Sequence, residues 1–145
     1  DLFFVGGGSG DRLKKLVARY HMEKNVHFLG PLPHEKIFDV LKSLDLYVQP
    51  SNAESHGRVI VEAMSVGCPV IGSNVGGIPE LVHPDFIFKK KNATDLYKTI
   101  KKNLSSSKII ESSKYSYQMA KNFEQKKLYT KRKNFYKTIM EDLKW

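Results

Sequence analysis

Two glutamates in one polar stretch, Glu54 and Glu62, are the side chains best suited to chemistry in this sequence of 145 residues. The stretch runs from Pro50 to Met64, and its pattern predicts a loop that leads into a helix starting near Gly57. Glu54 then lies in the loop and Glu62 about one turn into the helix, so both can face one ligand. Carboxylates suit sugar hydroxyls, because each carboxylate accepts charge-assisted hydrogen bonds.

The start of the same predicted helix is a second candidate for ligand binding. Backbone N–H groups at residues 56 to 59 have no acceptor within a helix, so they are suited to a diphosphate. A purely structural alternative pairs Glu62 with Arg58 one turn earlier, an i,i+4 contact that contributes about 0.2–0.5 kcal/mol. The residues alone leave both explanations open.

A glycine cluster near the N-terminus, Gly6-Gly7-Gly8-Ser9-Gly10, follows an apolar run and precedes a helical pattern. Turns of this kind present backbone amides to a phosphate. The dinucleotide-binding fingerprint does not fit, because Asp11 occupies the position of its third glycine. A tight turn that needs positive φ angles explains the cluster equally well.

The elements that must position these residues alternate between strand and helix. Strands are expected at residues 2–5, 26–29, 46–48, 69–72 and 86–88, with helices from 11 to 20, 37 to 44 and 58 to 66 between them. The Lys-rich segments 92–104, 108–122 and 123–143 are expected to be helical. This order predicts an α/β fold, a Rossmann-like parallel sheet with helices on both faces and a helical C-terminal extension. Ligands of such sheets bind outside the carboxyl ends of the strands, where the loop with Glu54 is expected.

Composition excludes several classes of protein. The apolar fraction of 41% and the aromatic fraction of 11% predict a globular chain with one core. No apolar run approaches the roughly 20 residues of a membrane helix. Cys68 is the only cysteine, so no disulfide can form within the chain, and its apolar neighbours predict a buried side chain.

The net charge of +9 favours anionic partners, such as nucleotides or acidic lipid surfaces. The basic runs are Lys89-Lys90-Lys91, Lys101-Lys102, Lys126-Lys127 and Lys131-Arg132-Lys133. We expect solvated helix faces, with peripheral contact with an acidic membrane as the functional alternative, at about 1 kcal/mol per cation. Nucleic acid is not expected as a partner, because no zinc finger, helix-turn-helix or aromatic RNA motif is present.

No metal site is expected, because four of the five histidines lie at no metal-ligand spacing with one another or with a carboxylate. These four residues are His21, His27, His34 and His83. The loop residue His56 is expected to be solvated, with donation to a sugar hydroxyl or a diphosphate as the alternative. Glu80 is expected to place a charge at a helix start.

A set of ordered motifs resembles a known family. Glu54, seven further residues and Glu62, followed by Ala63-Met64 and by Gly67-Cys68-Pro69-Val70-Ile71, are similar to the signature of retaining glycosyltransferases of family 4. Residues 75–82 are similar to the next block of that family, and residues 26–30 and 45–51 also lie in family order. The resemblance covers Leu2 to about Val82, over half of the chain. It implies the C-terminal, donor-binding domain of a GT-B enzyme, in which two Rossmann-like domains flank a cleft.

The resemblance implies a role for each candidate residue. Glu54, the catalytic candidate, contacts hydroxyls of the donor sugar, and Glu62 holds the ribose hydroxyls of the nucleotide. The segment whose backbone amides approach the sugar and the diphosphate is Ser55, His56, Gly57, Arg58 and Val59. The loop beside the nucleobase is Leu29, Gly30, Pro31 and Leu32, and the glycines that border the cleft are Gly6, Gly7 and Gly8. His56 and Arg58 depart from the commoner aromatic and aliphatic types, which leaves the local sugar and phosphate contacts open.

The resemblance further implies transfer of a sugar from a nucleotide-activated donor, such as a UDP- or GDP-sugar, with retention of the anomeric configuration. It implies no cofactor and no metal, and the leaving diphosphate assists deprotonation of the acceptor. The expected setting is polysaccharide, glycolipid or glycoconjugate synthesis in the cytoplasm, including the inner face of the membrane. The alternatives are a nucleotide-sugar epimerase of the same fold and a basic interaction module without enzymatic activity.

The abrupt start on a core strand predicts a fragment. We expect one nucleotide-sugar-binding domain over residues 1–145, with an α/β part at 1–91 and a helical part at 92–145. A glycan or lipid-linked acceptor is expected to bind mainly to an N-terminal domain outside this chain. Such a fragment is expected to bind donor weakly and to transfer no sugar by itself.

Overall fold

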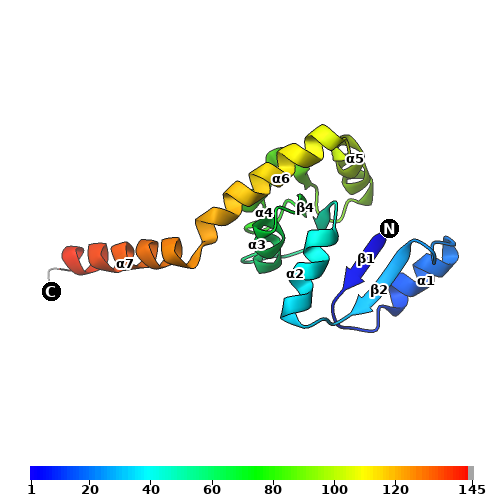
Figure 1. Cartoon of the computed structure of the whole chain (residues 1–145), viewed down its shortest axis with the longest axis horizontal. Helices are drawn as coiled ribbons and strands as arrows, with labels where there is room; N and C mark the ends of the chain where they lie inside the picture. Colours follow the sequence, from blue (N-terminus) through cyan, green and yellow to red (C-terminus); the bar gives the residue numbers. More distant parts are fainter. Residues whose placement is uncertain (144–145) are drawn as a thin grey trace. The chain divides into compact units, whose positions relative to one another are not determined.

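A computed structural model describes residues 1–143 (Figure 1). The chain divides into two compact units, one from Asp1 to Asp39 and the other from Val40 onward. Helix α2 (His34–Ser43) spans the boundary. Each unit contains parallel strands followed by helices, which confirms the predicted α/β class. The predicted single sheet is replaced by two parallel sheets, because β1 and β2 pair with each other and β3, β4 and β5 form a separate ladder.

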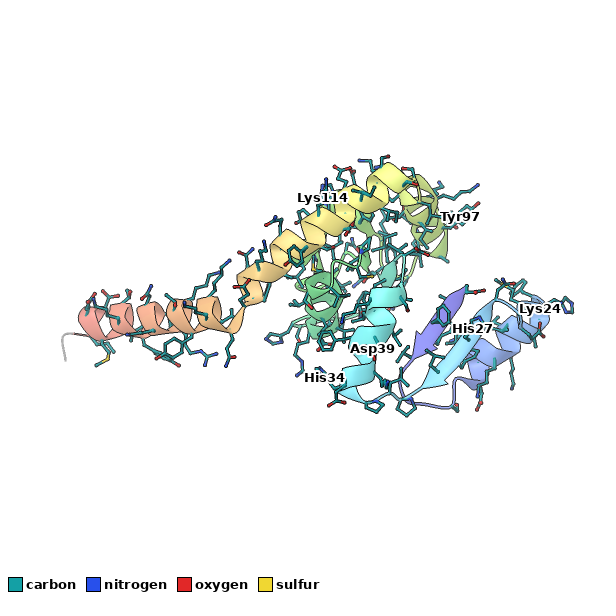
Figure 2. The ribbon with its side chains drawn as sticks, in the orientation of Figure 1. Lys24, His27, His34, Asp39, Tyr97 and Lys114 are labelled. Atoms are coloured by element: carbon teal, nitrogen blue, oxygen red, sulfur yellow. The ribbon has the colours of Figure 1, made fainter. Side chains whose placement is uncertain are left out.

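The first unit places helix α1 (Asp11–Arg19) between the parallel strands β1 (Leu2–Val5) and β2 (Val26–Gly30) in the sequence. Phe4 and Phe28 stack across the strand pair with ring centroids 5.2 Å apart. On neighbouring positions, Phe3 stacks on His27 at 4.9 Å, and His27 is labelled on β2 in Figure 2. The two ring stacks fix the register, because each partner lies directly opposite the other.

The second unit contains the larger sheet, in the order β3 (Tyr47–Gln49), β4 (Val70–Ser73) and β5 (Ile87–Phe88). Two helices, α3 (Arg58–Ser65) and α4 (Ile78–Leu81), and the 3₁₀ turn η1 (Pro84–Phe86) connect the strands. The core combines the central strand with these connections and includes Ile60, Ala63, Met64, Val70, Ile71, Ile78 and Phe86. Burial of these side chains supplies the driving force for this unit. A Cβ atom on Gly72 would lie 2.4 Å from Ile78 Cγ2, so α4 packs directly on β4.

The remaining described elements are helical: α5 (Ala93–Asn103), α6 (Ser106–Ala120), the 3₁₀ turn η2 (Lys121–Phe123) and α7 (Gln125–Asp142). Helix α6 packs against α3 through small side chains, since Ser112, Ser116 and Ala120 are its buried residues. Every described side chain of α7 is exposed. Trp145, the last residue, lies outside the described range.

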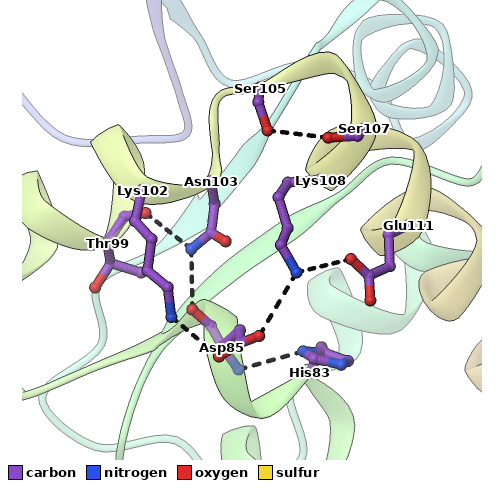
Figure 3. Close-up of polar contacts among 9 residues, drawn as sticks. All are labelled: His83, Asp85, Thr99, Lys102, Asn103, Ser105, Ser107, Lys108 and Glu111. Carbon is purple, nitrogen blue, oxygen red and sulfur yellow. Dashed lines mark hydrogen bonds and ion pairs between the residues drawn. The ribbon is translucent and has the colours of Figure 1, made fainter.

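The basic runs lie on exposed positions, as predicted, but Lys89-Lys90-Lys91 lies in the turn between β5 and α5 and not on a helix face. One of them also takes part in a polar cluster that joins η1 to α5 and α6 (Figure 3). In this cluster Lys102 Nζ lies 3.1 Å from Asp85 Oδ1, and Lys108 Nζ lies 3.8 Å from Asp85 Oδ2. These two ammonium groups hold the pKa of Asp85 below its usual value. None of the helices formed by residues 1–143 is long and apolar enough to cross a lipid bilayer.

Candidate functional site

The loop between β3 and α3 holds the strongest candidate, Glu54, in a set of hydrogen bonds. Glu54 Oε1 accepts from the backbone N–H of Gly57 at 3.1 Å. The other carboxylate oxygen accepts from Gln49 Nε2 and from Ser51 Oγ, each at 3.4 Å. Glu54 is half-buried, so the carboxylate is fixed by the protein and still reaches solvent. A carboxylate has about four lone-pair positions, and three are used here, which leaves about one for a hydroxyl of a ligand.

The start of α3 follows directly from this loop. Gly57 adopts a left-handed conformation with φ of 57°, and a Cβ atom there would lie only 3.1 Å from Leu81 Cδ1. The glycine therefore allows the chain to turn sharply into α3 while it packs closely against Leu81. The first N–H groups of a helix have no intrahelical acceptor, and the helix dipole favours an anion there. Arg58 and Val59, the first two helical residues, are exposed, which leaves this end open to a ligand.

The two residues before this helix are also exposed. His56 Nδ1 lies 3.0 Å from Ser55 Oγ, so the two side chains form a local hydrogen bond. The prediction that His56 is solvated is confirmed by its exposure. Its alternative role, donation to a sugar or a diphosphate, stays a prediction.

Glu62 lies in the second turn of α3 and is half-buried. Tyr47 on β3 connects it electrostatically to Glu54. The pKa of the Tyr47 hydroxyl is raised to about 12, first by burial and then by the negative charges of Glu54 and Glu62. The charges of both carboxylates thus reach the same hydroxyl of β3. That the two glutamates face one ligand stays a prediction.

A second loop, after β4, packs on the first. The buried Ser73 Oγ donates to the backbone carbonyl of Ser51 at 2.7 Å. A Cβ atom on Gly77 would lie 3.2 Å from the carbonyl oxygen of Ser55, and one on Gly76 would collide with the backbone of Glu54. The Gly76-Gly77 pair thus allows the backbone of this loop to approach the loop that carries Glu54.

The first unit brings together the other two predicted segments. The N–H of Gly6 donates to the carbonyl of Gly30 at 2.9 Å, and Val5 pairs with Gly30 in the ladder. The turn of Gly6, Gly7 and Gly8 therefore lies beside the predicted nucleobase loop, of which Leu29 and Gly30 still belong to β2 and only Pro31 and Leu32 lie beyond the strand. Gly6 and Gly8 have positive φ angles of 138° and 105°, and a Cβ atom on any of the three turn glycines would meet open space. This turn leaves room above its backbone amides, which an anion needs for close approach.

Cys68 is buried, as predicted. Burial raises the pKa of its thiol to about 11, so the thiolate needed for nucleophilic attack is absent at neutral pH. Within residues 1–143, no three His, Cys, Asp or Glu side chains are placed to hold a metal ion. Glu80 lies in the first turn of α4, at the helix start where it was expected.

The sequence reasoning missed three residues of this site, Tyr47, Gln49 and Ser51. A signal for the first two exists, since residues two apart on a strand face the same side and both Tyr47 and Gln49 are polar. Ser51 follows in the loop after this half-buried strand.

Comparison with known proteins assigns the family. The family model described as Glycosyl transferases group 1 matches residues 1–126. Protein CapJ of Staphylococcus aureus is 37% identical over 117 residues, which cover 77% of this chain and 29% of CapJ. The phosphatidylinositol N-acetylglucosaminyltransferase GPI3 subunit of Saccharomyces cerevisiae is 29% identical over 131 residues, which cover 86% of this chain and 29% of that protein. The chain thus spans under a third of the length of these relatives.

Solved structures agree with this assignment. Sucrose-phosphate synthase from Thermosynechococcus elongatus superposes with a TM-score of 0.84 and 25% identity over 97% of this chain and 39% of that chain. HepE from Anabaena, solved in complex with UDP, gives a TM-score of 0.80 and 25% identity over 96% of this chain and 40% of that chain. These neighbours are GT-B glycosyltransferases. The chain therefore belongs to the family of group 1 glycosyl transferases.

Proposed function

We propose that this chain is the donor-binding part of a retaining glycosyltransferase of family 4 and that it binds a nucleotide-activated sugar. The observation that carries the proposal is the hydrogen-bonded carboxylate of Glu54, held in the loop after β3, directly before the exposed start of the helix α3 that carries Glu62. One carboxylate suits the sugar and the other suits the ribose, while the helix start suits the diphosphate between them.

The comparisons support a uridine nucleotide as the first donor to test. HepE has been solved in complex with UDP and glucose and in complex with UDP-glucose, and it is 26% identical to this chain in those structures. In our proposal Glu54 contacts the sugar hydroxyls, and Glu62 accepts from the ribose hydroxyls. Ser55, His56, Gly57, Arg58 and Val59 surround the diphosphate, and residues 29–32 lie beside the base.

The chemistry that we propose breaks the bond between the anomeric carbon of the donor and the diphosphate oxygen. The acceptor hydroxyl forms the new bond to that carbon on the same face, and its proton passes to the departing diphosphate. No nucleophile from the protein takes part. The N–H groups at the start of α3 stabilise the negative charge that develops on the leaving group, which is where preorganised donors lower a barrier most.

The experiment is a thermal-shift panel with UDP, GDP, ADP, UDP-glucose, GDP-mannose and ADP-glucose. A ligand at 100 times its Kd is expected to stabilise the chain by about 2.7 kcal/mol. Glu54→Ala is then titrated with the best nucleotide sugar and with its nucleoside diphosphate. We expect selective loss of the nucleotide-sugar interaction, because a sugar contact cannot be lost from a ligand without sugar. Glu141→Ala, an exposed glutamate on α7, serves as the control.

Three results contradict the proposal. Absence of any thermal shift across the panel, at millimolar ligand, argues for a basic interaction module instead. Equal losses for both ligands in Glu54→Ala refute the assignment of Glu54 to the sugar. Conversion of the donor to a different sugar without an acceptor points to an epimerase. Contact with an acidic membrane, and a cytoplasmic location, stay predictions.

A further inference from the structure

Three polar side chains lead to Glu54 in a single direction. The Tyr47 hydroxyl donates to Gln49 Oε1. Gln49 Nε2 donates to Ser51 Oγ at 2.7 Å and makes a longer contact of 3.4 Å with Glu54 Oε2. The Ser51 hydroxyl in turn donates to Glu54 Oε2 at 3.4 Å. The donors therefore all point toward the carboxylate, an arrangement in which each hydrogen bond polarises the next.

The direction of these hydrogen bonds depends on the Tyr47 hydroxyl, which is the first donor. A side-chain amide has an acceptor oxygen at one end and a donor nitrogen at the other. Burial and two nearby carboxylates raise the pKa of Tyr47 to about 12, so its hydroxyl keeps its proton at neutral pH. Because this proton engages Gln49 Oε1, the amide nitrogen is turned toward Ser51 and Glu54. With the amide reversed, its oxygen would face the carboxylate and repel it.

We propose that Tyr47 and Gln49 are positioning residues, which hold the carboxylate of Glu54 in the orientation that receives hydroxyls of the donor sugar. The inference rests on the proposed function, since it assumes that Glu54 contacts the sugar. Gly57 holds the other carboxylate oxygen at 3.1 Å, so the two oxygens are fixed from opposite sides. With both held, the carboxylate does not lose rotational freedom when the sugar binds, and preorganisation of this kind strengthens binding.

This role predicts a specific pattern of losses. Tyr47→Phe keeps the ring and its packing but removes the proton that orients the amide. Gln49→Met keeps the length of the side chain but removes both amide groups. Each change acts on the ligand through Glu54, so each weakens nucleotide-sugar binding and leaves nucleoside diphosphate binding unchanged. The affinity for the nucleotide sugar is expected to fall about two- to tenfold. This range corresponds to the net contribution of one hydrogen bond.

The experiment titrates the 145-residue chain with the nucleotide sugar that shifts its melting most among UDP-glucose, GDP-mannose and ADP-glucose, and with its nucleoside diphosphate. The variants are Tyr47→Phe, Gln49→Met, Glu54→Ala and the two double variants that combine either change with Glu54→Ala. We expect Tyr47→Phe and Gln49→Met to weaken sugar binding in the wild-type background only. In the Glu54→Ala background neither change has a further effect, since the group that they position is gone.

Tyr97→Phe is the control, because Tyr97 on α5 is 58% exposed and the Lys101 ammonium lies over its ring, 5.7 Å from the centroid (Figure 2). This variant is expected to bind both ligands as the wild type does. Melting temperatures of all variants show whether each one folds, and Gln49→Met tests the inference where Tyr47→Phe does not fold.

The outcomes separate the inference from the function on which it rests. Wild-type sugar affinity in both Tyr47→Phe and Gln49→Met overturns the positioning role, as do equal losses for both ligands or losses that persist without Glu54. In those cases a selective effect of Glu54→Ala still supports the proposed function. If Glu54→Ala itself fails to separate the ligands, or no ligand binds, the proposed function is wrong and the inference is lost with it.

Discussion

The carbonyl oxygen of Glu54 lies 1.6 Å from the point that a Cβ atom on Gly76 would occupy. No side chain fits in that space, so the loop after β4 can reach the loop after β3 only if residue 76 is glycine. Gly76 also has a positive φ of 51°, which L side chains rarely adopt. Two separate constraints, one from a neighbouring loop and one from the local backbone, thus meet at one residue beside the candidate catalytic group.

We expect Gly76→Ala to destabilise the chain by about 2–4 kcal/mol, because the methyl group collides with backbone that cannot swing away. Gly67→Ala is the matched control. Gly67 has a similar φ of 76°, but a Cβ atom there would make an ordinary contact of 3.5 Å with Ser113 Oγ. Its cost is expected to be about 1–2 kcal/mol, from the left-handed backbone alone. Urea denaturation measures both, and equal losses in the two variants would show that the two loops do not meet as described.

Glu62→Ala is expected to weaken binding of the nucleoside diphosphate by about 10- to 100-fold. The ribose hydroxyls lose a charged acceptor, which contributes about 1.5–3 kcal/mol. Glu62→Gln keeps one acceptor oxygen and is expected to lose less. Isothermal titration with the nucleoside diphosphate and its 2′-deoxy form checks the assignment. The wild type is expected to prefer ribose, and this preference is expected to shrink in Glu62→Ala.

The control for this change is Glu111→Ala, on the exposed surface of α6, where the carboxylate pairs with Lys108 at 2.9 Å. It removes the same charge far from the loops around Glu54 in the chain and is expected to leave nucleotide affinity unchanged. Equal affinities of the wild type for ribose and deoxyribose nucleotides refute the ribose role of Glu62.

Folding stability is expected to fall with rising pH above about 8.5. The thiol of Cys68 has a pKa of about 11 in the folded chain, whereas an exposed thiol has a pKa of about 8.5. Between these values the unfolded chain releases the proton and the folded chain keeps it, so the stabilisation present at neutral pH is lost as pH rises. The slope for one such proton approaches about 1.4 kcal/mol per pH unit.

Urea denaturation of the wild type and of Cys68→Ala, from pH 7 to 10.5, isolates this effect. Cys68→Ala lowers stability by a constant amount, because it removes buried atoms, but its decline above pH 8.5 is expected to be shallower. Parallel curves for the two proteins would mean that the thiol ionises equally in the folded and unfolded states, contrary to its burial.

The sequence predicted the order of elements, because strands and helices here follow local periodicity. It was less accurate at boundaries that a neighbouring strand decides. The apolar run of Leu46, Tyr47 and Val48 predicted a strand at 46–48, but the strand covers Tyr47–Gln49. Its start is set by the bond from the N–H of Tyr47 to the carbonyl of Pro69 at 2.8 Å, and a partner 22 residues away has no trace in local periodicity.

The site was predictable to the same extent. Glu54 and Glu62 could be predicted, because charged residues just after a strand and within the following half-buried helix indicate a functional role. The reason for Gly76 did not follow from its neighbours, because it depends on the approach of two loops whose residues lie 22 positions apart. Tyr47 was assigned to the strand at 46–48 and Gln49 lay just beyond it; neither was predicted as part of the site, since the hydrogen bonds between their side chains depend on the folded structure.

Asn103, at the end of α5, is only 1% exposed (Figure 3). Its Nδ2 donates at 2.9 Å to the backbone carbonyls of Asp85 and of Thr99, and thereby ties η1 to the helix. Asn103→Asp replaces this donor with an oxygen that faces two carbonyl oxygens. It also places a charge at the negative end of a helix dipole, in a buried position.

We expect Asn103→Asp to lower the free energy of unfolding at pH 7 by about 2–3 kcal/mol. Burial beside carbonyl oxygens raises the pKa of the new carboxyl above the value of about 3.9 in the unfolded chain. Stability of the variant relative to the wild type therefore declines as pH rises through this interval, and the deficit is smaller at pH 4, where the protonated acid can donate one hydrogen bond.

Asn92→Asp is the control. Asn92 caps the start of the same helix, where its Oδ1 accepts from the N–H of Asp95 at 2.9 Å and a carboxylate is equally suited. Its effect is expected to stay within about 0.5 kcal/mol. Chemical denaturation at both pH values measures the difference, and a deficit of Asn103→Asp that does not depend on pH would show that the new carboxyl is not buried against these carbonyls.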